Sequence, residues 1–111
     1  MVKFSFKYKG KEFNLDVLEC KSIFSRAWGL MFRKKGKPLL FIFPRKNLQP
    51  IHSFFCKTFF AIWFFDDKII DAKIVKPWKF SIIPKSKFNK LLEIPCFDSS
   101  FFLIYRRYRN L

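Results

Sequence analysis

Two arginines flank the segment whose residue types are best suited to bind a ligand. Arg26 and Arg33 lie on either side of AWGLMF, in which Trp28 precedes Gly29. A guanidinium group matches planar oxyanions such as carboxylate and phosphate through paired hydrogen bonds. The segment therefore predicts a site for a small anion or polar ligand, formed by Arg26, Arg33, Trp28 and nearby backbone N–H groups. The alternative is ordinary packing, in which Gly29 ends a helix and the Leu-Met-Phe residues enter the core.

Aromatic residues interleaved with basic residues suggest a second binding chemistry. The pattern occurs at residues 26–33 and again at residues 76–80, where Trp78 lies between lysines. Proteins that bind single-stranded nucleic acid combine stacking rings with positive charge, and the net charge here is +15. The basic residues are nevertheless spread from Lys3 to Arg109, and the chain lacks RNP-type and helix-turn-helix motifs. Nucleic acid is therefore the alternative partner to a small anion, and a purely compositional origin of the charge stays open.

Residues that could catalyse a reaction or hold a metal are few and far apart. His52 is the only histidine, and Cys56 follows it by four residues. On a continuous strand these two side chains would be about 13 Å apart, too far to share an ion. Asp66 and Asp67 fit a hairpin turn, where Asp favours the backbone geometry. We therefore expect no metal and no cofactor, and an enzyme is the less favoured alternative to a binding module. His52 is either structural or a ligand contact.

The cysteines and the apolar runs bear on the cellular location. Cys20, Cys56 and Cys96 are odd in number and form no CxxC pair, so we expect thiols in a reducing compartment. The N-terminal MVKFSFK lacks the apolar region of a signal peptide. The longest apolar run, FFAIWFF at residues 59–65, is far shorter than the roughly 20 residues that span a bilayer. These features predict a cytoplasmic protein without a membrane span.

The elements that must position these residues begin with a β-hairpin. Apolar residues alternate with polar ones over residues 2–8 and again over residues 12–17, with Gly10 between the two runs. A two-residue loop of either Gly10-Lys11 or Lys9-Gly10 keeps the apolar side chains of both strands on one face. The hairpin is therefore predicted, while its register stays open between these two loops.

Short strands and one short helix are expected in the rest of the chain. A helix of at most two turns fits residues 22–29. The run at 59–65 is apolar throughout, so it is either covered on both faces or exposes Phe on one. The tail at 101–109 fits a last strand or an amphipathic helix. Further strands are expected at 38–44, 51–56, 69–75, 80–83 and 91–94. The chain is thus predicted to be one mainly β domain over residues 1–111, an antiparallel β-sandwich or partly open barrel with one short helix.

Six segments, in order, resemble the family catalogued as domain of unknown function 192. They are RAWGLMFR at 26–33, LFIFP at 40–44, IHSFF at 51–55, FFD at 64–66, VKPW at 75–78 and LLEIP at 91–95. The resemblance covers about residues 4–96, and the basic aromatic tail at 97–111 lies beyond it. It implies a compact β-sandwich or barrel with the Gly-Leu-Met segment after a short helix. The family has no agreed activity, so the resemblance assigns no catalytic residue.

Three departures from the family pattern affect any function that uses those positions. Ala61 stands where the family often has an acidic residue, Ser53 replaces the usual Met, and Cys96 replaces a common Gly. The sequence as a whole predicts a non-enzymatic binding or interaction module. Its partner and oligomeric state are not indicated by the sequence. The candidate ligand-binding residues are Arg26, Trp28, Arg33, His52 and Trp78.

Overall fold

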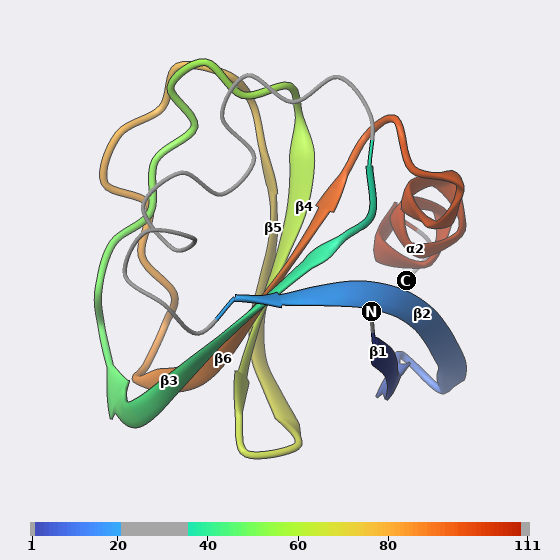
Figure 1. The fold of residues 1–111 in the computed structure, drawn as a ribbon, viewed down its shortest axis with the longest axis horizontal. Coiled ribbons are helices and arrows are strands. Elements are labelled where there is room, and N and C mark those ends of the chain that lie inside the picture. Colours follow the sequence, from blue (N-terminus) through green and yellow to red (C-terminus); the bar gives the residue numbers. More distant parts are fainter. Residues whose placement is uncertain (1, 21–35, 110–111) are drawn as a thin grey trace.

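A computed structural model describes residues 2–20 and 36–109 of the chain (Figure 1). In this part a six-stranded sheet has the order β1-β2-β3-β6-β4-β5. The strands are β1 (Val2–Tyr8), β2 (Lys11–Cys20), β3 (Leu39–Asn47), β4 (Phe59–Phe65), β5 (Lys68–Val75) and β6 (Phe88–Pro95), and helix α2 (Ser99–Arg109) follows them. The sheet curls around α2 as an open half-barrel (Figure 1). The predicted fold class is confirmed in its partly open barrel form, although the β2–β3 pair is parallel rather than antiparallel.

The predicted hairpin is confirmed, and its loop is Lys9-Gly10. Tyr8 pairs with Lys11 and Phe6 with Phe13, so β1 and β2 are joined by two residues. Lys9 and Gly10 both have positive φ, 49° and 82°, as the tight primed hairpin turns require. The rings of Phe6 and Phe13 stack with centroids 5.5 Å apart, which fixes the apolar face of the hairpin toward the core.

Strand β4 is covered on both faces, because alternate residues enter two separate hydrophobic clusters. Phe60, Ile62 and Phe64 pack in a cluster with the hairpin and the buried face of α2. Phe59 and Trp63 pack on the opposite face of the sheet. Every residue of β4 except its last is almost completely buried. The continuous apolar run therefore results from the central place of β4 in the sheet.

Two predicted strands are wrong. Residues 51–56 and 80–83 form no strands and share a single isolated bridge between Ile51 and Ile82. The two segments hydrogen-bond to each other as loops, and a turn at residues 54–55 interrupts the first one. The aromatic residues that give these segments the composition of strands therefore lie in loops and do not pair in the sheet.

Other boundaries also differ from the prediction. The register between β3 and β6 shifts between Ile42 and Asn47, around Pro44, which has no N–H for the ladder. Strand β6 begins at Phe88, three residues before the strand expected at 91–94. The tail forms α2 rather than a strand, with Asp98 accepting hydrogen bonds from the N–H and hydroxyl groups of Ser100 as a cap. The helix predicted at residues 22–29 lies outside the described residues.

The described residues bear on the predicted metal and membrane chemistry. Within residues 2–20 and 36–109 no three His, Cys, Asp or Glu side chains gather where they could hold a metal ion. The same ranges contain no helix with the length and apolar character needed to cross a membrane. All three cysteines lie in these ranges as thiols, two of them buried.

Candidate functional site: an exposed aromatic cluster

Five aromatic side chains gather at the surface. They come from a first loop at residues 48–58 and a second loop at residues 76–87. We call His52, Phe54, Phe55, Trp78 and Phe80 the aromatic cluster. The Phe54 ring lies 5.3 Å from the His52 ring, 6.0 Å from Trp78 and 5.4 Å from Phe80, and Phe55 lies 4.8 Å from Trp78. Phe80 and Trp78 expose 74% and 60% of their surface, which is unusual for residues of this size.

A buried serine holds the two loops together. Ser53 is completely buried, and its hydroxyl donates to the carbonyl oxygen of Lys76 at 2.6 Å and accepts from the N–H of Lys79 at 2.8 Å. Its own N–H donates to the Lys79 carbonyl oxygen at 2.8 Å, and its carbonyl accepts from the Trp78 N–H at 3.0 Å. Since Ser53 lies next to Phe54, these bonds fix the first loop against the second loop on both sides of Trp78.

The backbone is strained where two of the rings project. Phe55 and Trp78 adopt φ angles of 59° and 64°, in the left-handed region that bulky residues avoid. Each such residue costs on the order of 1–3 kcal/mol, and it persists only where the surroundings determine the conformation. Here the Ser53 hydrogen bonds supply that constraint around Trp78. The loops are therefore folded in a way that keeps large rings out of the core.

Lysines lie beside the aromatic cluster in both loops. Lys57, Lys76 and Lys79 are exposed beside the aromatic residues in sequence. The loops themselves, residues 48–58 and 76–87, contain no Asp or Glu, although the strands that flank them carry the buried Asp71 and Glu93. The combination of exposed rings and uncompensated lysines suits a ligand that presents planar groups and negative charge together.

The structure brings together two of the predicted site residues, His52 and Trp78, through the ring of Phe54. His52 is exposed, and its Nδ1 accepts a hydrogen bond from the N–H of Phe54 at 3.2 Å. The separation expected for His52 and Cys56 on a continuous strand does not apply, because residues 51–56 form no strand. Arg26, Trp28 and Arg33 lie outside the described residues, so the predicted anion site stays a prediction.

The sequence points only in part to the other three members of the aromatic cluster, Phe54, Phe55 and Phe80. Phe80 belongs to the basic and aromatic segment at residues 76–80 that also contains Trp78, whereas the sequence predicts Phe54 and Phe55 to lie in a strand. The useful signal was Ser53, a small polar residue at a position where the resemblance implies Met. A buried hydroxyl needs hydrogen-bond partners, and these partners come from the loop that carries Trp78.

A second unusual chemical environment lies in the core, around Glu93. This residue of β6 is opposite Ala61 on β4 and Leu39 on β3, and only 6% of its surface is exposed. Burial raises the pKa of the Glu93 carboxyl to about 8. The pKa of the Cys56 thiol is raised to about 11 by burial and by the nearby Glu93. Glu93 is therefore mostly protonated at pH 7 and lies in this core as a neutral carboxylic acid. The sequence does not indicate this environment.

Comparisons with known proteins give the chain its family. No protein-family model matches it. A UPF0127 protein of Pyrococcus furiosus is 30% identical over 91 residues, which cover 78% of each chain. A UPF0127 protein of Pyrococcus horikoshii is 35% identical over 84 residues, 72% of each chain.

Two solved structures share the fold. A protein of unknown function from Novosphingobium aromaticivorans matches with a TM-score of 0.76 at 14% identity, over 96% of this chain and 76% of that one. A protein from Sinorhizobium meliloti, described as a candidate transcription regulator, matches with a TM-score of 0.72 at 17% identity, over 82% and 76%. These identities are low, so the two structures show the fold alone. From its similarity to the Pyrococcus proteins, the chain belongs to the uncharacterised UPF0127 family.

Proposed function

We propose that this protein is a non-enzymatic binding module that holds single-stranded nucleic acid on the aromatic cluster. The observation that carries the proposal is the set of five rings on two loops, residues 48–58 and 76–87, which contain lysines and no Asp or Glu. Bases present flat apolar faces and phosphates present negative charge, so both features of the surface have a counterpart in the ligand.

The geometry of the rings favours stacking on unpaired bases. Trp78 and Phe80 expose more of their surface than Phe55 does, and much of each ring is accessible to a planar ligand. Stacking a base on an aromatic side chain contributes about 1–3 kcal/mol and tolerates any base. We therefore expect little sequence preference. A duplex would bind less well than a single strand, because its bases are already stacked.

Charge sets the background against which stacking must be measured. A chain with net charge +15 adheres to any polyanion at low salt. That electrostatic part falls steeply as salt rises, whereas the stacking contribution survives. The proposal therefore concerns the affinity that remains when the salt concentration is moderate.

Several predictions from the sequence remain part of this proposal. The segment around Arg26, Trp28 and Arg33 is proposed as an additional anion contact. We also propose a cytoplasmic location, a single domain over residues 1–111 and membership of domain of unknown function 192. The last of these rests on the six resembling segments rather than on the UPF0127 relatives.

Binding of a fluorescein-labelled oligothymidylate of about twelve nucleotides tests the proposal. Affinity is measured by fluorescence anisotropy at salt concentrations between about 50 and 200 mM. Replacing Trp78 by Ala should lower the affinity at the upper salt concentration by roughly 5-fold to 150-fold, the range that loss of one stacked base implies. Phe80→Ala should act in the same direction.

Phe102→Ala supplies the matched control, because Phe102 is a 68% exposed aromatic residue on α2 rather than on the cluster loops. This variant should bind like the wild type. Trp28→Phe leaves Trp63 and Trp78 as the two tryptophans. In this variant oligothymidylate should quench the emission of exposed Trp78, whereas Trp63 is completely buried and should not respond. Equal affinities of Trp78→Ala and wild type at every salt concentration would reduce the interaction to charge alone and refute the proposal.

A further inference from the structure

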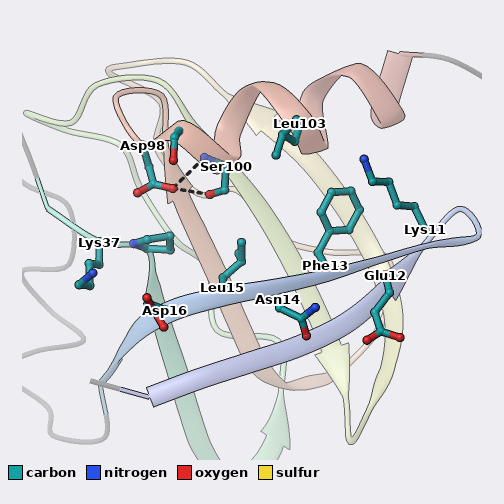
Figure 2. A pocket seen from close by; sticks show the side chains of 12 residues that line it. Lys11, Glu12, Phe13, Asn14, Leu15, Asp16, Lys37, Asp98, Ser100 and Leu103 are labelled. Carbon is teal, nitrogen blue, oxygen red and sulfur yellow. Dashed lines mark hydrogen bonds between the residues drawn. The ribbon is translucent and has the colours of Figure 1, made fainter.

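A groove separate from the aromatic cluster runs along the edge of β2. It has a volume of about 420 Å³ and lies between residues 11–16 of β2, the segment around Lys37 and the first turn of α2 (Figure 2). Figure 2 shows Phe13 and Leu15 pointing toward the α2 side, where Leu103 lies. Glu12, Asn14 and Asp16 also line the groove, although they alternate with the buried residues along the strand. One wall of the groove is therefore the strand edge itself.

This edge carries backbone groups without a neighbouring strand in the described part of the chain. Strand β3 pairs with β2 only from Leu18 to Cys20. The Leu18 N–H points away from β1 and donates to the Pro38 carbonyl oxygen at 3.0 Å. Backbone groups of every second residue in a strand point to the same side. Glu12, Asn14 and Asp16 therefore direct their N–H and C=O groups into the groove.

We propose that this groove binds an extended peptide of a partner protein, which adds to the sheet beside β2 and places a carboxylate at the Lys11 end. Three residues of β2 offer both a donor and an acceptor, as strand addition requires. The stretch from Lys11 to Asp16 is about 17 Å long at the usual rise, which accommodates about five residues. Alternate apolar side chains of the peptide would face Phe13, Leu15 and Leu103.

The charges at the two ends of the groove give the peptide a direction. Lys11 and Leu103 also line an adjoining pocket with Arg106 and Arg107, so the hairpin end of the groove is basic. Asp16 and Asp98 lie at the other end, with Lys37. A carboxylate, from a chain terminus or from a side chain, fits the basic end. A C-terminal peptide would then run antiparallel to β2.

Charge also argues against two other occupants. If two copies of this chain paired through β2 in the register centred on Asn14, Glu12 would lie opposite Asp16 of the second copy. Like charges directly opposite each other destabilise a sheet. Nucleic acid is disfavoured because three residues that line the groove, Glu12, Asp16 and Asp98, are acidic. A peptide satisfies the strand edge without either penalty.

The probe for this proposal is a pool of acetylated pentapeptides in which Val, Leu or Phe alternates with Thr and the C-terminal carboxylate is free. Amide hydrogen exchange measured by NMR should show protection of the Glu12, Asn14 and Asp16 N–H groups when the pool is added. A second pool with an amidated C-terminus should bind at least about threefold more weakly. A third, amidated and ending in Glu, distinguishes a side-chain carboxylate from a terminal one.

Two proline variants form a matched pair. Asn14→Pro removes an N–H that points into the groove and leaves the β1–β2 ladder intact, so binding of the free-acid pool should weaken at least tenfold. Ser5 is opposite Asn14 and hydrogen-bonded to its side chain, and the outward groups of Ser5 point to the far edge of the hairpin. Ser5→Pro therefore disturbs the hairpin equally and should bind within twofold of the wild type.

The basic end has its own variant. In Lys11→Ala/Arg106→Ala, the free-acid and amidated pools should bind alike. Failure of every pool to protect the three N–H groups would overturn the proposal, as would unchanged binding to Asn14→Pro. Protection of the same groups by oligothymidylate instead of peptide would assign the groove to nucleic acid and likewise overturn it.

Discussion

Replacing Glu93 by Gln should stabilise this protein at alkaline pH and have little effect near pH 5. The unfolded chain ionises Glu93 above its ordinary pKa of 4.5, whereas the folded chain keeps the proton until about pH 8 because the carboxyl is buried. Between these values the unfolded state binds fewer protons at this site than the folded state. The free energy of unfolding therefore falls as the pH rises through this window, and the Gln variant lacks this loss.

The size of the effect follows from the two pKa values. A difference of one in pKa corresponds to about 1.4 kcal/mol, so raising the pKa from 4.5 to about 8 costs the folded state about 5 kcal/mol once the carboxyl is ionised in both states. At pH 7 the cost is about 3 kcal/mol on the same basis. Both figures are large beside the 5–15 kcal/mol by which domains are typically stable.

Urea unfolding of wild type and Glu93→Gln at a series of pH values from about 5 to 8.5 measures this difference. Repulsion among the many basic residues changes the stability of both proteins alike, so the difference between them isolates position 93. Glu12→Gln removes the same charge from an exposed residue and should keep the wild-type pH dependence. Parallel stability curves for wild type and Glu93→Gln would refute the reasoning, because they would mean that the carboxyl ionises equally easily in both states.

Three further predictions concern the loops, the hairpin and the arginine segment. Ser53→Ala should lower the free energy of unfolding by about 1–3 kcal/mol in chemical denaturation, because the backbone groups of Lys76 and Lys79 lose the hydroxyl partner that the buried Ser53 gives them; an unchanged value would mean that other groups replace it. Gly10→Ala should lower the free energy of unfolding by about 1–2 kcal/mol, because alanine is strained at the φ angle of 82° that Gly10 adopts. The new methyl group would meet the Arg107 side chain at 3.9 Å, an ordinary contact, so the cost comes from the backbone alone, and a stabilised variant would contradict this. Arg26→Ala and Arg33→Ala should each abolish the rise in melting temperature caused by inorganic phosphate, and if both variants simply unfold the arginines are structural.

The parts of the fold that could be predicted are those that local sequence determines. The hairpin follows from alternation around Gly10, and the buried strand β4 follows from an uninterrupted apolar run. The strand predicted at 51–56 is wrong, because the segment has the composition of a strand but hydrogen-bonds to the loop at residues 76–82. Pairing of that kind depends on the tertiary structure, and no periodicity within the segment reveals it.

The candidate site shows the same division. Trp78 and His52 could be singled out by residue type, but their proximity depends on the hydrogen bonds of Ser53 and on the left-handed backbone at Phe55 and Trp78. Glu93 does not stand out in the sequence, because a single acid in an apolar run has no catalytic spacing. Only the pairing of β6 with β3 and β4 places that carboxyl in the middle of the sheet.

The place of β6 in the strand order determines when the fold can be completed during synthesis. β6 is the last strand along the chain, yet it lies between β3 and β4, so both of these have an open edge until β6 emerges from the ribosome. The hairpin can form early because its contacts are local, whereas the middle of the barrel must wait for residues 88–95. A nascent chain halted before that point would expose two apolar strand edges, the condition that favours aggregation and chaperone binding.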